Sequence, residues 1–162
     1  MLVATHERSL THMRLEDGQL GQGNFEGSIQ PNFVESIKAR KCTEIAAGWQ
    51  TSASITTHGV VLVWGGNGRG QLGMGDRESR LTPTPVPLTD GLFRKRYTTQ
   101  TTRGASVSMG HYHTLILTDE HRVYSFGGND NGQLGHGGLV DELEPKPEGA
   151  RVGERGDDET PR

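Results

Sequence analysis

Short apolar stretches alternate with glycine-rich segments along most of the chain. The clearest is Val60–Trp64, a wholly apolar run rich in valine, which is typical of a strand with neighbours on both faces. Thr82–Leu88 also has an extended character, but its prolines cannot donate to a sheet ladder and predict an edge strand. Further strands are expected at residues 33–37, 43–47, 51–56, 106–109, 113–118 and 122–126, with turns at 18–24, 57–59 and 119–121. The pattern therefore predicts an all-β protein.

One tetrapeptide, Gly-Gln-Leu-Gly, occurs three times, beginning at Gly18, Gly70 and Gly132. Two copies close a longer phrase with the same internal spacing, because 17 residues separate Gly48 from Gly65 and also Gly110 from Gly127. The residues of this repeat signature are Gly48, Trp64, Gly65, Asn67, Gly70, Gln71, Leu72 and Gly73, and then Gly110, His113, Gly127, Asn129, Gly132, Gln133, Leu134 and Gly135. Copying with a period of about 50 to 60 residues indicates a propeller or a similar array, in which these positions are structural.

The repeats divide the chain into five segments. Residues 1–40 form a degenerate or half repeat, 41–90 the first complete repeat, 91–104 an inserted basic loop, and 105–140 the first part of a second blade. Residues 141–162 carry eight acidic and four basic side chains and no aromatic one, so we expect a disordered charged tail. An acidic arm that binds a partner is the alternative interpretation of this tail.

Composition narrows the classes of function. The chain has 24 glycines among 162 residues, a share that suits tight turns and disfavours helices. The formal net charge of −3 gives no global attraction to nucleic acid or to an anionic membrane. Cys42 is the single cysteine, which excludes an internal disulfide and fits a reducing compartment. We therefore expect an intracellular protein, cytoplasmic or nuclear, with no membrane segment.

A glycine motif at Gly68–Gly73 matches the Gly-x-Gly-x-x-Gly pattern of dinucleotide-binding turns and follows an apolar strand. Such a site needs a helix next, so that N-terminal amides meet the pyrophosphate, but residues 74–87 contain three prolines. In the second repeat Asp130 takes the place of Gly68. We interpret the motif as a structural turn and expect no cofactor.

Two histidines, His111 and His113, lie two positions apart at the start of an expected strand, on one face. A metal site would need further ligands, and the lone Cys42 and the lack of a carboxylate–histidine cluster lead us to expect no metal. We expect His113 to form hydrogen bonds within its blade, and Gln71 and Gln133 to fix their loops through hydrogen bonds to the backbone. No serine lies in a nucleophile-elbow context, so no catalytic residue is nominated.

One concentrated positive patch consists of Arg94, Lys95, Arg96 and Arg103, between the two full repeats. Charge runs of this kind are usually solvated loops. The functional interpretation is a contact with phosphate or with the acidic surface of a partner. Insertions between repeats fall on one face of an array, often the binding face.

The repeated phrase resembles the regulator of chromosome condensation repeat. The residues that carry the likeness are Trp64-Gly65-Gly66-Asn67 with Gly70–Gly73, and Phe126-Gly127-Gly128-Asn129 with Gly132–Gly135. The resemblance implies a β-propeller of seven blades with four strands each. Trp64 and Phe126 hold equivalent positions before Gly-Gly, and we expect both in the blade core. The chain departs from the pattern at Thr51, where His113 stands in the other copy, and it holds only about two and a half repeats. A fragment, or a form whose missing blades come from another chain, would account for that count.

What the resemblance implies for function is broader than a single activity. The founding member of the family is a guanine-nucleotide exchange factor for the small GTPase Ran and binds chromatin, and many relatives only bind other proteins. Our first hypothesis is a non-catalytic propeller-repeat protein that mediates protein–protein interaction. The second is an exchange factor, or part of one, for a Ran-like GTPase, with chromatin or nucleic acid as a further partner. A nucleotide-binding enzyme that uses Gly68–Gly73 is the third.

Overall fold

The computed structural model describes residues 2–5, 8–13, 17–88 and 102–148. Within these ranges the secondary structure is β-strand with one short 3-10 turn and no α-helix. The strands are β1 (Leu2–Thr5), β2 (Arg8–Met13), β3 (Ser28–Phe33), β4 (Cys42–Ala47), β5 (Thr51–Thr56), β6 (Val61–Gly65), β7 (Arg80–Pro85), β8 (Gly104–Met109), β9 (His113–Thr118), β10 (Val123–Gly127) and β11 (Glu142–Pro147), and the turn η1 spans Glu35–Ile37. No helix in the described ranges is long and apolar enough to cross a membrane.

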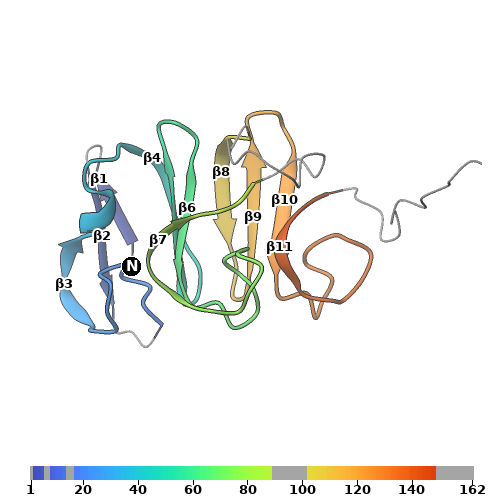
Figure 1. Cartoon of the computed structure of the whole chain (residues 1–162), viewed down its shortest axis with the longest axis horizontal. Helices are drawn as coiled ribbons and strands as arrows, with labels where there is room; N and C mark the ends of the chain where they lie inside the picture. Colours follow the sequence, from blue (N-terminus) through green and yellow to red (C-terminus); the bar gives the residue numbers. More distant parts are fainter. Residues whose placement is uncertain (1, 6–7, 14–16, 89–101, 149–162) are drawn as a thin grey trace, which may run out of the picture.

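Three antiparallel sheets stand side by side (Figure 1). The first sheet has the order β1-β2-β3, the second β4-β5-β6-β7 and the third β8-β9-β10-β11. Every strand pairs with its neighbour in sequence, so each sheet is a meander. The two four-stranded sheets are blades of a partial propeller, and the predicted fold class is confirmed.

All three sheets share one pairing register at their last two strands. In the second sheet Val63 pairs with Thr84 and Gly65 with Arg80, and a bulge lies between the two pairs. In the third sheet Ser125 pairs with Lys146 and the bulge follows at the same place. The first sheet repeats the irregularity between Thr11 and Met13. The irregularity thus lies at the same place in each sheet, where a bulge bends the strand locally just before the long loop.

Residues 1–40, where we expected a degenerate or half repeat, contain the first sheet. Its three strands correspond to β5, β6 and β7 of the second sheet, so within the described residues it has three of a blade's four strands. The predicted strand at 33–37 is wrong, because β3 ends at Phe33 and η1 follows. The amide of Ile37 donates to the carbonyl of Val34 at 3.1 Å. This turn brings both apolar side chains, Val34 and Ile37, against the second sheet, which a strand could not do because its side chains alternate.

The expected disorder of residues 141–162 is wrong for Glu142–Pro147, which form β11 on the outer edge of the third sheet. The segment is ordered because it pairs with β10 and because Leu143 packs on the Gly70 loop of the second sheet. The second blade therefore runs through β11 and does not stop at residue 140. Residues 149–162 of the proposed tail, and residues 89–101 of the proposed inserted loop, lie outside the described ranges.

Two apolar clusters fill the spaces between the sheets. One joins the second and third sheets around Ile55, Val63, Ile116 and Phe126. The other joins the first and second sheets around Trp64 and its neighbours. Every residue of β5 and β6 is buried, as the apolar run of β6 predicted. The second sheet is thus the core layer of the described structure.

The antiparallel strands give the stack two different ends. The long-loop end, below in Figure 1, carries loops 17–27, 66–79 and 128–141 and the short turns 48–50 and 110–112. The short-hairpin end carries the turns 57–60 and 119–122. The long loops hold the repeated tetrapeptide, so the residues of interest for function lie mainly at the first of these ends.

Candidate functional site

Two of the three long loops are each held in shape by one asparagine and one glutamine side chain. In loop 66–79, Asn67 Oδ1 accepts the amide of Leu72 at 2.9 Å, and Asn67 Nδ2 donates to the carbonyl of Asp76 at 3.0 Å. Gln71 Oε1 accepts the amide of Arg69 at 2.8 Å. Because asparagine spans the loop while glutamine closes its tip, buried backbone groups find partners without a regular ladder.

Loop 128–141 repeats this arrangement. Asn129 Oδ1 accepts the amide of Leu134 at 3.0 Å, and Gln133 Oε1 accepts that of Asn131 at 2.9 Å. The loop in the first sheet has the glutamine contact from Gln19, which accepts the amide of Asp17 at 3.2 Å. The three loops thus share one conformation, and they differ in what lies against them.

Two of the three loops are docked on the next sheet. At Gly70, where φ is +76°, an added Cβ atom would lie 2.5 Å from Leu143 Cδ2 on β11. At Gly73, where φ is +67°, it would lie 2.8 Å from the Phe126 ring on β10. The loop of the first sheet meets the second sheet in the same way, Gly18 against Leu81 and Gly21 against Trp64. Both the left-handed backbone and the close approach exclude a side chain here.

Hydroxyl groups complete each docked contact. Ser52 Oγ donates to the Gln19 carbonyl at 2.9 Å, and Thr114 Oγ1 donates to the Gln71 carbonyl at 2.8 Å. Trp64 Nε1 adds a second donor to the Gln19 carbonyl at 2.9 Å. A docked loop therefore needs a leucine, an aromatic ring and a hydroxyl from the sheet that receives it.

The third loop receives none of these from the residues that the structure describes. A Cβ atom added at Gly132 would find only Leu139 Cδ2 of the same loop, 3.8 Å away. The sheet face beside this loop is open as well. Leu117 on β9 is 39% exposed, whereas Ile55, its counterpart on β5, is 1% exposed. Figure 1 shows loop 128–141 projecting from the third sheet on the side away from the second.

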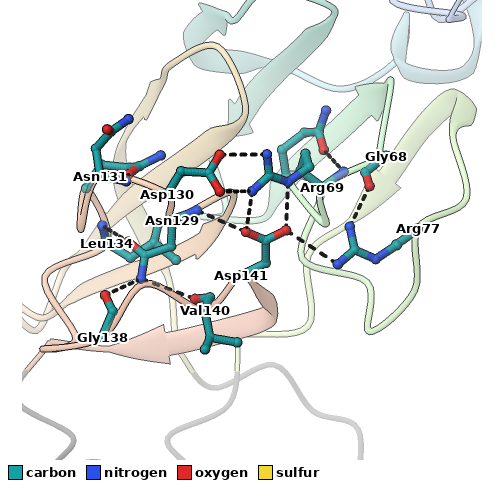
Figure 2. A network of polar contacts seen from close by, with 12 residues as sticks. Gly68, Arg69, Arg77, Asn129, Asp130, Asn131, Leu134, Gly138, Val140 and Asp141 are labelled. Atoms are coloured by element: carbon teal, nitrogen blue, oxygen red, sulfur yellow. Dashed lines mark hydrogen bonds and ion pairs between the residues drawn. The ribbon is translucent and has the colours of Figure 1, made fainter.

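A network of charged side chains joins the second and third sheets (Figure 2). Arg69 Nε and Nη2 donate to the two carboxylate oxygens of Asp141 at 2.7 and 2.6 Å. Arg69 Nη1 and Nη2 donate to the two oxygens of Asp130, each at 2.8 Å. Asp141 also accepts the amide of Asn129 at 3.1 Å and lies 3.4 Å from Arg77 Nη2. The Arg69 guanidinium forms bidentate contacts with both carboxylates. These contacts hold the seam, meaning the packed boundary between two neighbouring sheets, in one geometry.

The ionisation of this network follows from its contacts. Hydrogen bonds from Arg69 lower the pKa of Asp141 to about 2 and also lower the pKa of Asp130. The same contacts, with Asp141 first, raise the pKa of Arg69. In loop 66–79 a hydrogen bond from Arg80 lowers the pKa of Asp76. All four groups are therefore charged at neutral pH.

Three aromatic side chains form a strip on the long-loop end. The Trp49 and His111 rings stack with centroids 4.7 Å apart and planes at 19°, and the centroid of Tyr112 lies 4.1 Å from that of His111. Arg69 Cζ lies 6.0 Å from the Tyr112 centroid. Trp49 belongs to the turn before β5, and His111 and Tyr112 to the turn before β9. This aromatic strip (Trp49, His111, Tyr112) thus crosses the seam between two blades.

The sequence-predicted partner residues lie at the other end of the stack or outside the described residues. Arg94, Lys95 and Arg96 fall in the undescribed range 89–101. Arg103 lies at the short-hairpin end, where its Nη2 donates to the Thr57 carbonyl at 3.3 Å and its Nε lies 3.9 Å from Asp119 Oδ2. Arg103 therefore bridges hairpins of adjacent sheets and is about half exposed.

His113 and the Gly68–Gly73 motif both lie among packing and loop contacts of the sheets. The ring of His113 packs on Gly110, and burial lowers the pKa of His113. The motif is followed by a loop and by strand β7, with no helix to meet a pyrophosphate. Among the described residues no group of three or more His, Cys, Asp or Glu side chains could hold a metal ion.

The geometry agrees with comparison to known proteins. Two models described as the regulator of chromosome condensation (RCC1) repeat match the chain, one over residues 42–71 and 105–133, the other over residues 58–117 and 120–150. The chain belongs to the RCC1 repeat family. The expected family is thereby confirmed, with the repeats falling on the second and third sheets.

Several curated proteins are similar to this chain. It is 34% identical over 132 residues to the ultraviolet-B receptor UVR8 of Arabidopsis thaliana, a match that covers 82% of this chain and 28% of that protein. It is 35% identical over 147 residues to the probable E3 ubiquitin-protein ligase HERC3 of Homo sapiens, covering 90% of this chain and 13% of the ligase. The chain thus spans less than a third of the length of these curated relatives.

Solved structures support the fold. Yeast RCC1 (Prp20), in its complex with Kap60, superposes with a TM-score of 0.69 at 20% identity, covering 89% of this chain and 34% of that one. A second structure, of Prp20p from Saccharomyces cerevisiae, gives a TM-score of 0.68 at 18% identity, with 86% and 33% covered. That second structure was described together with the binding properties of Prp20p to Gsp1p and histones.

Sequence reasoning missed two features of this RCC1-repeat chain. Arg69 occupies an unspecified position of the Gly68–Gly73 pattern, and its partners Asp130 and Asp141 lie in the next repeat. The aromatic strip was missed because its members belong to two turns far apart in sequence. A signal was present, since Trp49 and His111 each follow the glycine that ends a first strand, and adjacent blades place equivalent turns side by side.

Proposed function

We propose that this chain is a non-catalytic propeller-repeat protein that mediates protein–protein interaction, and that the open face of its third sheet is a site where it does so. The observation that carries the proposal is the contrast between Leu117, which is 39% exposed, and Ile55, which the third sheet covers almost completely. Exposed apolar faces next to a preformed loop mark interaction sites.

The contacts of the two docked loops indicate which side chains a partner would bring to the open face of the third sheet. By analogy with Leu81 and Leu143, the incoming unit brings a leucine to Gly132. By analogy with Trp64 and Phe126, it brings an aromatic ring to Gly135, and a serine or threonine hydroxyl reaches the Gln133 carbonyl. The partner is therefore a further blade of the same kind, supplied by a longer form of this chain or by another protein.

Self-association tests the proposal, because the chain itself carries such blades. We expect sedimentation velocity to show concentration-dependent association of the full chain at micromolar concentrations, and Leu117→Asp to abolish it. Phe25→Asp is the matched control, since Phe25 is exposed in the loop of the first sheet and lies on no open sheet face. A strictly monomeric chain that also binds no apolar dye, or equal loss in both variants, would contradict the proposal.

Exchange-factor activity on a Ran-like GTPase is the second candidate function, favoured by the fold shared with Prp20p, a protein characterised by its binding to Gsp1p and histones. Such activity needs no acid–base residue, because the factor acts by stabilising the nucleotide-free GTPase. The test is release of a fluorescent guanine nucleotide from a Ran-type GTPase with and without the full chain. Unchanged release would remove this candidate and leave the interaction role standing. Both roles agree with an intracellular setting, in cytoplasm or nucleus, which the unpaired Cys42 favours.

A further inference from the structure

The aromatic strip is exposed to solvent, and none of its residues belongs to either apolar core cluster. Trp49 is 63% exposed, and Tyr112 is also among the exposed large hydrophobic residues. One face of the Trp49 ring lies on His111, so much of the remaining surface meets solvent. Exposed tryptophan and tyrosine are the residues that concentrate binding energy at protein interfaces.

The strip is built before any partner arrives. The amide of Trp49 donates to the Gly110 carbonyl at 3.4 Å, so the two turns that carry the strip are joined through their backbones. Arg69, held by Asp130 and Asp141, lies beside the Tyr112 ring and continues the row of planar groups. A surface that is already ordered loses little entropy when it binds.

The charges around the strip are mainly negative. The turns and loops at the long-loop end hold six carboxylates (Asp17, Glu26, Asp76, Glu78, Asp130 and Asp141) and two guanidinium groups (Arg69 and Arg77). Arg80, at the start of β7, adds a third guanidinium by pairing with Asp76, so six negative and three positive charges give a net charge of −3 when histidine is not counted. Arg69 is neutralised by its two aspartate partners, so it offers little attraction to an anion. The Cβ atoms of Asp17 and Gln50 both lie near Gly66, which places Asp17 beside the turn that carries Trp49.

We propose that the aromatic strip binds a basic segment of a protein partner, with an arginine or lysine side chain lying on the Trp49 ring. Asp17 and the net negative charge of these loops supply the long-range attraction, and the indole supplies the cation–π contact. Nucleic acid does not fit this surface, because its phosphates would meet the net negative charge. The inference rests on the proposed interaction role and names a second surface and the chemistry of its partner.

Tryptophan fluorescence of the full chain gives a direct test. The chain has two tryptophans, and Trp64 is wholly buried, so a change of emission on binding reports on Trp49. The probe is an arginine-rich glycine–serine peptide without aromatic residues, compared with matched lysine and glutamate peptides and with oligothymidine. We expect saturable quenching by the arginine peptide, weaker quenching by the lysine peptide, and none by the other two. Added salt should weaken the binding of both basic peptides.

Variants separate the strip from general charge attraction. With a labelled arginine peptide followed by anisotropy, Trp49→Ala should weaken binding by about tenfold, the effect of losing one partly desolvated cation–π contact. Phe25→Ala removes another exposed aromatic ring at the same end and should leave affinity unchanged. Equal loss in both variants, unchanged affinity in Trp49→Ala, or tighter binding of oligothymidine would overturn the inference.

The proposed function and this inference fail in different ways. Leu117→Asp should abolish self-association and leave peptide binding intact, because Leu117 lies on the open sheet face and not in the strip. Peptide that fails to bind a chain whose association still depends on Leu117 would remove this inference alone. Self-association that is lost in Trp49→Ala would show that the strip receives a second copy of the chain, which also overturns it.

Discussion

The second and third sheets have equivalent strands in different surroundings. β5 lies between two sheets and every one of its residues is buried, whereas β9 has one neighbouring sheet and its residues alternate between buried and less buried. Ile55 and Leu117 occupy the same place in the two strands, yet only the first is covered. Each blade supplies one side of the seam with its neighbour. Whether an apolar side chain on that side is buried depends on the presence of the neighbouring blade.

The two seams also differ in chemistry. The seam between the first and second sheets is closed by Trp64 and Ser52, which both donate to the Gln19 carbonyl. The seam between the second and third sheets has Phe126, which has no donor, and relies on Thr114 and on the Arg69 network. One loop conformation is therefore compatible with two sets of contacts.

Truncating the two equivalent apolar residues gives the largest expected contrast. Ile55→Ala should lower the free energy of unfolding by about 3 kcal/mol, because a fully buried side chain leaves a cavity. Leu117→Ala should cost less than about 1 kcal/mol, because water already reaches this side chain. Urea unfolding of the full chain measures both. Equal losses would mean that the third sheet is covered in solution.

Glycine substitutions probe the docked and the open loop. Gly73→Ala should cost about 3 kcal/mol, since the positive φ disfavours alanine and the new methyl group would meet the Phe126 ring. Gly135→Ala has nearly the same φ of +71° but its nearest neighbour is Glu148 Oε1 at 3.6 Å, so only the backbone cost of about 1 kcal/mol remains. The measurement is again chemical unfolding, and the pair isolates steric contact from conformational strain. A smaller loss for Gly73 than for Gly135 would contradict the docked seam.

Much of this comparison could be predicted from sequence, because the repeat is encoded locally. The spacing of the glycine phrase identified two repeats, which fall on the second and third sheets, and the valine-rich run identified β6 as a strand covered on both faces. The outer strand β11 was missed because the composition of residues 141–148 is that of a disordered segment. Its order comes from pairing with β10 and from Leu143 on a loop far away in sequence. Pro145 and Pro147 repeat the spacing of Pro83 and Pro85 in β7, which was the available signal.

The functional residues were harder to predict for a physical reason. Arg69 bonds to carboxylates 61 and 72 positions later, and nothing in its own segment specifies them. The strip of Trp49, His111 and Tyr112 exists only when two blades stand side by side. Sequence indicated the basic group around Arg94 as a partner site because charge density is visible along a chain, and that site remains a prediction. Arg103, its described member, bridges two hairpins.

Removing Arg69 should disturb the seam between the second and third sheets and change its response to acid. Arg69→Met should lower stability at pH 7 by about 2 kcal/mol, because Asp141, largely buried, loses its main partner. The folded pKa of Asp141, about 2, lies below its ordinary 3.8, so the contribution is present above pH 4 and is lost as the pH falls towards 2. The variant should therefore lose less stability over that interval than the wild type.

The control for this pH series is Arg122→Met. Arg122 Nε lies 3.8 Å from Glu120 Oε2 with both side chains about half exposed, so this pair should contribute less than about 0.5 kcal/mol. Unfolding free energies at several values between pH 2 and pH 7 provide the measurement. An Arg69 variant with the same acid response as the Arg122 variant would show that the network does not stabilise the seam.

The smallest expected contrast concerns the two loop carbonyls. Thr114→Val removes the hydroxyl that donates to the Gln71 carbonyl in a buried position and should cost about 1 kcal/mol. Ser52→Ala removes the equivalent donor to the Gln19 carbonyl, but Trp64 Nε1 still donates to that oxygen, so the loss should be about half as large. Urea unfolding of Ser52→Ala in a Trp64→Phe background sharpens the test, since the carbonyl then has neither donor. The serine substitution should cost more in that background than in the wild type, and simple additivity would mean that the two donors do not share one acceptor.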